Sequence, residues 1–215
     1  MKKIILTMIF SLFYIVSASA GPGINIGLSG NLGVFHGEAT ENENGDIDRD
    51  DATGVVGYGS VFIEKTLGER LAIGVDYVPS ALESEEASSS RLDKTSDDTG
   101  STITNKVSLD FEDMTTVYVT LSLTEDIYVK AGMVQVDVIT NETLGTGSTY
   151  ADADMDGETF GIGYNKDFDN GMFARIEGTY MDLGSVSVTA SNADNKVTIN
   201  SLEGASARFS IGKSF

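Results

Sequence analysis

The chain has 215 residues, 40% of them hydrophobic, and it contains no cysteine. Its 33 acidic side chains far outnumber its 14 basic ones, which gives a formal net charge of −19 at pH 7. These values exclude disulfide bonds and also nucleic-acid binding through the phosphate backbone, because such binding needs a basic surface. Two prolines and 24 glycines suit a domain of many strands and tight turns.

The first 20 residues have the three parts of a secretory signal peptide. The parts are the positive residues Lys2 and Lys3, the apolar run of residues 4–16, and the small residues Ala18, Ser19 and Ala20. The apolar run is too short for a transmembrane helix, which needs about 20 residues. We therefore expect residues 1–20 to be cleaved and residues 21–215 to form one exported domain.

After the signal peptide, apolar and polar residues alternate in eight successive segments, which is the pattern of β-strands. The segments are residues 24–36, 55–65, 71–77, 107–123, 127–134, 160–165, 174–180 and a last strand that ends at Phe215. In the second segment the pattern does not decide which face is apolar. Two sets compete there, Val55, Val61 and Ile63 against Val56, Tyr58 and Phe62.

The connections between these strands are alternately long and short. The long ones are residues 38–51, 81–104, 140–156 and an extended hairpin over 185–202, and the short ones are residues 66–69, 124–126 and 169–171. Outer-membrane barrels have long extracellular loops and short periplasmic turns, and only closed barrels or helices span lipid. The order predicts an all-β fold, an eight-stranded antiparallel up-and-down transmembrane β-barrel.

A water-soluble eight-stranded barrel is the alternative, and the polar face of its strands would be rich in charge. In this chain the polar face is small and uncharged at many positions, and most charges lie in the long loops. Those small positions include Gly27, Ser29, Gly74, Gly132, Gly161 and Gly163. The pattern therefore favours the membrane barrel, with this face lining the lumen.

The last strand carries Phe209, Ile211 and Phe215 on one face, opposed by polar or small residues. Together with the signal peptide and four hairpins, this ending resembles the outer-membrane β-barrel superfamily, near outer-membrane protein A and the opacity-type surface proteins. The resemblance implies a bacterial outer-membrane location, a monomer in contact with lipid and lipopolysaccharide, and no peptidoglycan-binding domain. It also implies that the terminal Phe, with the two apolar residues before it, is an assembly signal for the barrel assembly machinery.

Five charged residues fall on the face that lines the lumen. They are Asp76, Lys130, Arg175, Glu177 and Arg208. An eight-stranded barrel has an interior just wide enough for side chains to fill, and charges buried there must pair. We expect a plug of salt bridges, with Arg175 and Glu177 as paired members. A narrow polar path for ions or small solutes is the alternative, and a lumen for hydrophobic molecules is disfavoured by this polarity.

The acidic loops contain one partial metal-binding pattern, Asp152, Asp154, Asp156 and Gly157. The spacing matches the first half of a calcium loop, in which three oxygens converge and a glycine makes the turn. Position twelve is Gly163 instead of Glu, so we expect at most weak Ca²⁺ binding and no other cofactor. A solvated acidic loop is the favoured interpretation.

The sequence offers little for catalysis, because its only histidine, His36, stands at the outer end of the first strand without a fixed nucleophile motif. The predicted function is therefore a non-enzymatic barrel with a structural and surface-interaction role. The alternative function is a low-conductance, porin-like channel.

Overall fold

The computed structural model describes residues 23–43, 46–84, 86–93, 101–143, 149–191 and 196–215. The expected signal peptide lies outside these residues. All regular secondary structure in the described ranges is β-strand. None of these residues belongs to a helix long and apolar enough to cross a membrane.

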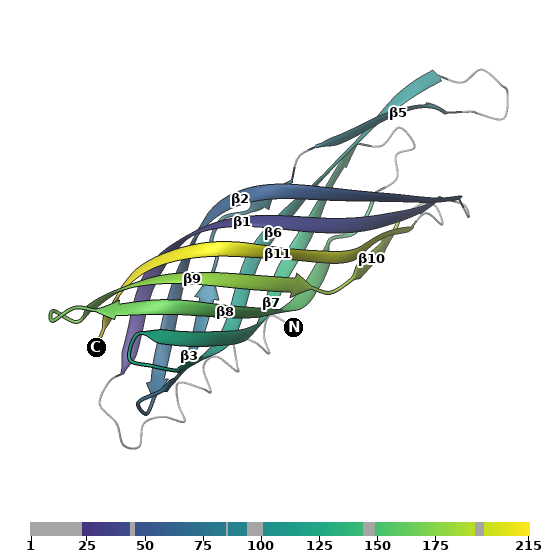
Figure 1. The fold of residues 1–215 in the computed structure, drawn as a ribbon. Coiled ribbons are helices and arrows are strands. Elements are labelled where there is room, and N and C mark those ends of the chain that lie inside the picture. Colours follow the sequence, from purple (N-terminus) through teal and green to yellow (C-terminus); the bar gives the residue numbers. More distant parts are fainter. Residues whose placement is uncertain (1–22, 44–45, 85, 94–100, 144–148, 192–195) are drawn as a thin grey trace.

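Eight strands form a closed ring (Figure 1). In ring order they are β1 (Ile24–Glu43), β2 (Asp46–Leu67), β3 (Leu71–Tyr77), β6 (Ser101–Ser122), β7 (Ile127–Thr143), β8 (Ala153–Asp167), β9 (Met172–Leu183) and β11 (Lys196–Ser214). Each strand pairs antiparallel with the next, and β11 pairs with β1 to close the ring. The predicted fold, an eight-stranded antiparallel β-barrel, is confirmed.

The register around the ring shows how strongly the strands are tilted. A path through directly opposed residues runs Val34, Ala205, Tyr180, Phe160, Ala131, Val119, Ile73, Lys65, Ile24. It leaves β1 at residue 34 and returns to β1 at residue 24, a shift of ten residues. Such a stagger accompanies the strand tilt, typically 35–45°, that closure of a barrel requires.

The two ends of the barrel differ. At the inner end, three short turns connect β2 to β3, β6 to β7 and β8 to β9, and backbone hydrogen bonds join Ile24 to Phe215. Gly68 and Gly171 adopt positive φ angles of 72° and 77° in two of these turns, a conformation that favours glycine. At the outer end, the other hairpins extend beyond the body of the barrel (Figure 1).

Three short strands lie off the ring at the outer end. They are β4 (Leu82–Glu83) and β5 (Ala87–Asp93), which pair with β6, and β10 (Val186–Thr189), which pairs with β11. The hairpin expected over residues 185–202 is thus present. Figure 1 shows β5 and the start of β6 as a ribbon that projects away from the barrel.

The long polar connections contain more strand than the sequence predicts. Residues 38–51, expected to be a loop, are largely the paired ends of β1 and β2, from Glu38↔Asp51 to Glu43↔Asp46. β7 likewise continues to Thr143, and β8 begins at Ala153. Backbone hydrogen bonds propagate a hairpin regardless of side-chain polarity, so a strand surrounded by water needs no apolar alternation.

Along the inner part of the barrel, the outward face is apolar and exposed. Leu28, Leu32, Phe160, Ile176 and Phe209, from four strands, are each 52–63% exposed. This continuous apolar surface, which we call the belt, alternates with inward residues that are polar. Such an arrangement is suited to lipid outside and a polar lumen inside.

Toward the outer end, the inward face becomes apolar. A buried cluster there consists of Val78, Met114, Val134, Val136, Val138, Met155 and Leu183. We call this set the outer core. Its outward neighbours on β8 are the exposed residues Asp154 and Asp156. The polar lumen face expected from the sequence is therefore found in the inner part of the barrel, and the inward face changes character along the same strands toward the outer end.

Candidate functional site: a lumen closed by ion pairs

Three ion pairs cross the lumen inside the belt. Lys130 Nζ lies 2.5 Å from Glu177 Oε1, and Arg175 binds Glu64 through two hydrogen bonds of 2.6 and 2.8 Å. The third pair joins Arg208 to Asp76. None of these ion pairs joins neighbouring strands. The Lys130–Glu177 pair links β7 to β9, the Arg175–Glu64 pair links β9 to β2, and the Arg208–Asp76 pair links β11 to β3. The pairs therefore connect separated parts of the wall.

Neutral side chains complete the hydrogen bonding of the three carboxylates. Glu64 also accepts hydrogen bonds from the Asn25 amide (3.1 Å) and the Tyr118 hydroxyl (3.0 Å). Glu177 accepts one from the Tyr128 hydroxyl at 2.9 Å, and Asp76 accepts one from Ser60 at 3.1 Å. Residues of β1, β6 and β7 are thus joined to the same network.

The network is buried and electrically balanced, with three anionic and three cationic side chains. Five of the six are at most 9% exposed, and the Arg175 side chain is 14% exposed. Burial of a charge is tolerable only when it is paired and hydrogen-bonded, and removing one partner leaves the other uncompensated. We call these six charged side chains the plug. The stability of each buried charge in the plug therefore depends on its partner.

Aromatic rings pack tightly around this plug. Each of four inward rings faces a glycine directly opposite on the neighbouring strand: Phe62 with Gly27, Tyr118 with Gly74, Tyr128 with Gly163, and Phe173 with Gly212. A Cβ atom added to any of these glycines would lie 2.3–2.5 Å from the ring. The glycines are therefore needed for the close approach of the rings, which in turn lie under the Arg175 guanidinium and other cations.

All five lumen residues named from the sequence, Asp76, Lys130, Arg175, Glu177 and Arg208, lie on the inward face and enter the network. The partners differ from those expected, because Arg175 binds Glu64 instead of Glu177. Glu64 was missed since it belongs to the second strand, whose inward face the pattern left undecided. The structure turns Tyr58, Phe62 and Glu64 inward. The five residues named from the sequence comprise three cations and only two anions. This imbalance indicated that one more acidic residue must face the lumen.

A cavity of about 300 Å³ lies at the inner end of the lumen. Arg175, Tyr128 and Phe173 form part of its wall. Arg175 belongs to the plug and the two rings pack around it, so the cavity reaches the plug from the inner end. At the outer end of the lumen, all seven members of the outer core are only 1–6% exposed.

The calcium-loop turn that the sequence pattern allows for Asp152, Asp154, Asp156 and Gly157 is not formed in the described residues. Asp154 to Gly157 belong to β8, so alternate side chains project outward along an extended strand and do not converge. Among the described residues, no three acidic or histidine side chains are grouped so that they could hold a metal ion. Gly157 makes no turn, and its missing Cβ instead allows β8 to approach Asp182 O of β9.

The three residues expected to form the assembly signal, Phe209, Ile211 and Phe215, all face outward and are 48–59% exposed. Phe215 exchanges backbone hydrogen bonds with Ile24, so the last residue closes the seam between β11 and β1. Their role in assembly stays a prediction.

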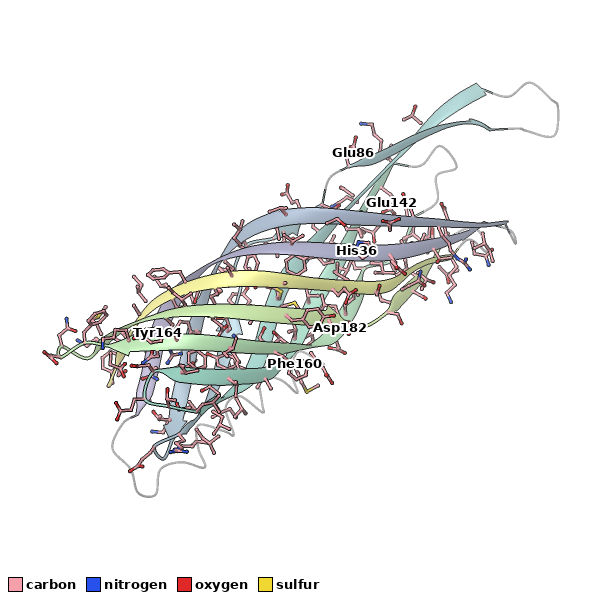
Figure 2. The ribbon with its side chains drawn as sticks, viewed as in Figure 1. His36, Glu86, Glu142, Phe160, Tyr164 and Asp182 are labelled. Atoms are coloured by element: carbon pink, nitrogen blue, oxygen red, sulfur yellow. The ribbon has the colours of Figure 1, made fainter. Side chains whose placement is uncertain are left out.

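His36 lies on the outward face of β1, away from the plug (Figure 2). Its Nδ1 is 3.0 Å from Thr53 Oγ1, and its Nε2 is 4.0 Å from Glu38. Figure 2 also shows Tyr164 and Phe160 in the belt and Asp182 and Glu142 farther toward the outer end. Along the outward surface, aromatic residues thus give way to acidic ones such as Asp182, whereas Glu142 is half-buried on the inward side of β7.

No protein-family model matches this chain, and no curated protein matches it. Solved structures do match. The outer membrane protein OprG from Pseudomonas aeruginosa superposes with a TM-score of 0.51 at 11% identity, covering 90% of this chain and 96% of OprG. The outer membrane protein AlkL, determined in lipid bilayers, gives 0.49 at 15% identity, with 93% of each chain covered. The outer membrane protease OmpT from Escherichia coli gives 0.44 at 12% identity, with 93% and 99% covered. At these identities the likeness to OprG shows the fold alone: the chain has the fold of a bacterial outer-membrane β-barrel.

Proposed function

We propose that this chain is an integral protein of the bacterial outer membrane, with a closed lumen and a structural, surface-presenting role. The observation that carries the proposal is the set of three ion pairs across the lumen. They are buried, charge-balanced and hydrogen-bonded to neutral neighbours, which is how a barrel is held shut and not how a wide pore is lined.

The membrane location is supported by the outward belt. A water-soluble protein rarely exposes a continuous apolar surface that surrounds the whole molecule. Here the exposed apolar residues come from all eight ring strands, while six charged side chains are enclosed. Strand number and the alternation of short turns with long hairpins support, as part of this proposal, a grouping with the small barrels of the outer-membrane protein A and opacity type.

The surface role is supported by the outer hairpins. Their outward face is acidic, with exposed residues that include Glu112, Asp154, Asp156, Glu158 and Asp182. On this proposal the hairpins meet ions, lipopolysaccharide and external partners above the membrane. No enzymatic activity is proposed, since the imidazole of His36 binds Thr53 on the outside of the barrel.

Conductance across planar lipid bilayers tests the proposal. The purified protein should insert without steady single-channel current at moderate voltage, because the plug and the outer core both close the lumen. The variant Glu177→Ala, which removes the partner of Lys130, should show brief openings or current noise. The matched variant Glu158→Ala changes an exposed outward carboxylate on the neighbouring strand and should stay silent.

Steady, ion-selective current from the unmodified protein would overturn the closed-lumen proposal. The low-conductance channel would then be the better account, with the six plug residues as its lining.

A further inference from the structure

The cavity at the inner end has features that a passive gap between turns would not require. Its volume of about 300 Å³ is at the lower limit of pockets that hold small organic molecules. It lies at the inner mouth of the lumen, and its surroundings come from all three short turns. We call it the vestibule.

The rim of the vestibule is strongly acidic. Glu69 of the first turn, Glu125 and Asp126 of the second, and Asp167 beside the third all line it, against the single rim cation Arg70. Among the described residues, the carboxylates of Glu69, Glu125 and Asp126 make no side-chain hydrogen bond or ion pair. These anions surround one opening from three different turns, so their fields add over it.

A second, independent feature lies deeper in the vestibule. Thr120 is inward on β6, lines the cavity and is only 8% exposed. Within the part of the chain that the structure describes, its hydroxyl has no hydrogen-bond partner. A hydroxyl on a residue that lines a cavity, with no partner in the described protein, can hydrogen-bond a guest there.

The chemistry of the wall selects among possible guests. An anion is disfavoured, because Arg175 already donates to Asn165 (2.9 Å) and to both oxygens of Glu64. A single metal ion is disfavoured as well, since no three acidic side chains among the described residues converge to ligate one. Carboxylates separated on different turns instead suit a guest whose positive charges are separated by a short apolar chain.

We propose that the vestibule binds a linear alkyl diammonium ion of the putrescine class. The two ammonium groups pair with rim carboxylates on different turns, and one of them also donates a hydrogen bond to the Thr120 hydroxyl. The methylene chain passes over the apolar wall formed by Ala72 and the Phe173 ring. This site adjoins the inner edge of the ion-pair plug, whose Arg175 forms part of its wall, and it lies away from the outer hairpins; binding does not depend on whether the lumen conducts.

Isothermal titration calorimetry of the folded barrel in zwitterionic detergent, with putrescine as the titrant, tests the proposal. We expect saturable binding at one site. Butylamine, which has one ammonium group, should bind at least fivefold more weakly. Sodium chloride at matched ionic strength should produce no saturable heat.

Two variants and one control separate the site from general charge attraction. Asp126→Asn combined with Asp167→Asn should weaken putrescine binding about tenfold, since each exposed ion pair is worth roughly two- to fivefold. Thr120→Val should weaken it about tenfold, and Thr120→Ser should restore it. Asp154→Asn with Asp156→Asn removes the same charge at the outer end and should change nothing.

Absence of saturable binding would overturn the proposal. So would equal weakening by the inner and outer pairs of Asn substitutions, because the cation would then follow net charge alone. Unchanged affinity in Thr120→Val would remove the buried hydroxyl from the site and contradict the assigned geometry.

Discussion

The inner and outer parts of this barrel use the same strands with opposite polarity. In the inner part, Phe160 and Ile162 of β8 face outward and are exposed, while the lumen holds charges such as Lys130. In the outer part, Asp154 and Asp156 of the same strand face outward, while Met155 is buried inside. The inward side of the wall thus changes from polar to apolar, although the same alternate residues of each strand continue to face inward.

This inversion reflects two different solvents. A strand wall surrounded by lipid places apolar groups outside and pairs its polar groups inside. A strand wall surrounded by water does the reverse and gains stability from an apolar interior. The reversal on β8 occurs between Phe160 and Glu158, so the outer boundary of the lipid phase should lie at that level.

The largest difference between the two interiors should appear when a plug charge is removed. Glu64→Ala leaves Arg175 without its anion, and breaking a buried pair in this way costs about 3–5 kcal/mol. Urea unfolding of the barrel in lipid vesicles measures the loss. The control Glu158→Ala removes an exposed outward carboxylate and should change stability by less than about 0.5 kcal/mol. Equal stability of the two variants would show that the plug does not support the inner part.

A charge on the outward face should distinguish lipid from water. Ile176→Arg places a cation in the belt on β9 and should destabilise the folded barrel by about 2–4 kcal/mol. Asp182→Arg makes a comparable change three outward positions farther along β9 and should cost almost nothing. The same vesicle-based unfolding assay compares them. Similar costs at both positions would place the two residues in one solvent and contradict the boundary.

The smallest of the three effects should come from the outer core. Val136→Ala removes two buried methylene equivalents opposite Met155, for an expected loss of about 2 kcal/mol including the cavity term. Because the outer core is apolar, the adjacent outward change Asp154→Ala should be nearly neutral. A local probe such as proteolysis of the outer hairpins should detect the loss even if the belt stays intact. If the outer hairpins of Val136→Ala and Asp154→Ala resist proteolysis equally well, the outer core is not a packed interior.

The barrel itself could be predicted from the sequence because alternation and turn length are local signals. Eight alternating segments and the order of long and short connections predicted the topology. The charged residues of the lumen were predicted because they lie on the face of each strand opposite its apolar residues. Glu64 could not be placed, since apolar residues occupy both faces of its strand and alternation then carries no information. Only the distant partners of β2, such as Arg175 on β9, decide its orientation.

The errors at the outer end have one physical origin. A pattern of alternate aspartates, as in Asp152, Asp154 and Asp156, is the spacing of calcium ligands and equally the outward face of a strand. Long polar stretches were expected to be loops because strands were sought by their apolar face. The inward residues Val134, Val136 and Val138 were likewise assigned no role, since the sequence does not show where lipid ends and water begins.

The most direct test of the two-solvent account measures solvent along one strand. The chain has no cysteine, so single cysteines at outward positions 154, 156, 158, 160, 162 and 164 of β8 can each carry a nitroxide spin label. In vesicles, oxygen partitions into lipid and a charged nickel chelate stays in water. We predict that oxygen dominates collisions at 160 and 162, that nickel dominates at 154 and 156, and that the crossover falls near 158. Nickel dominance at all six positions, or a crossover absent from this strand, would contradict the account.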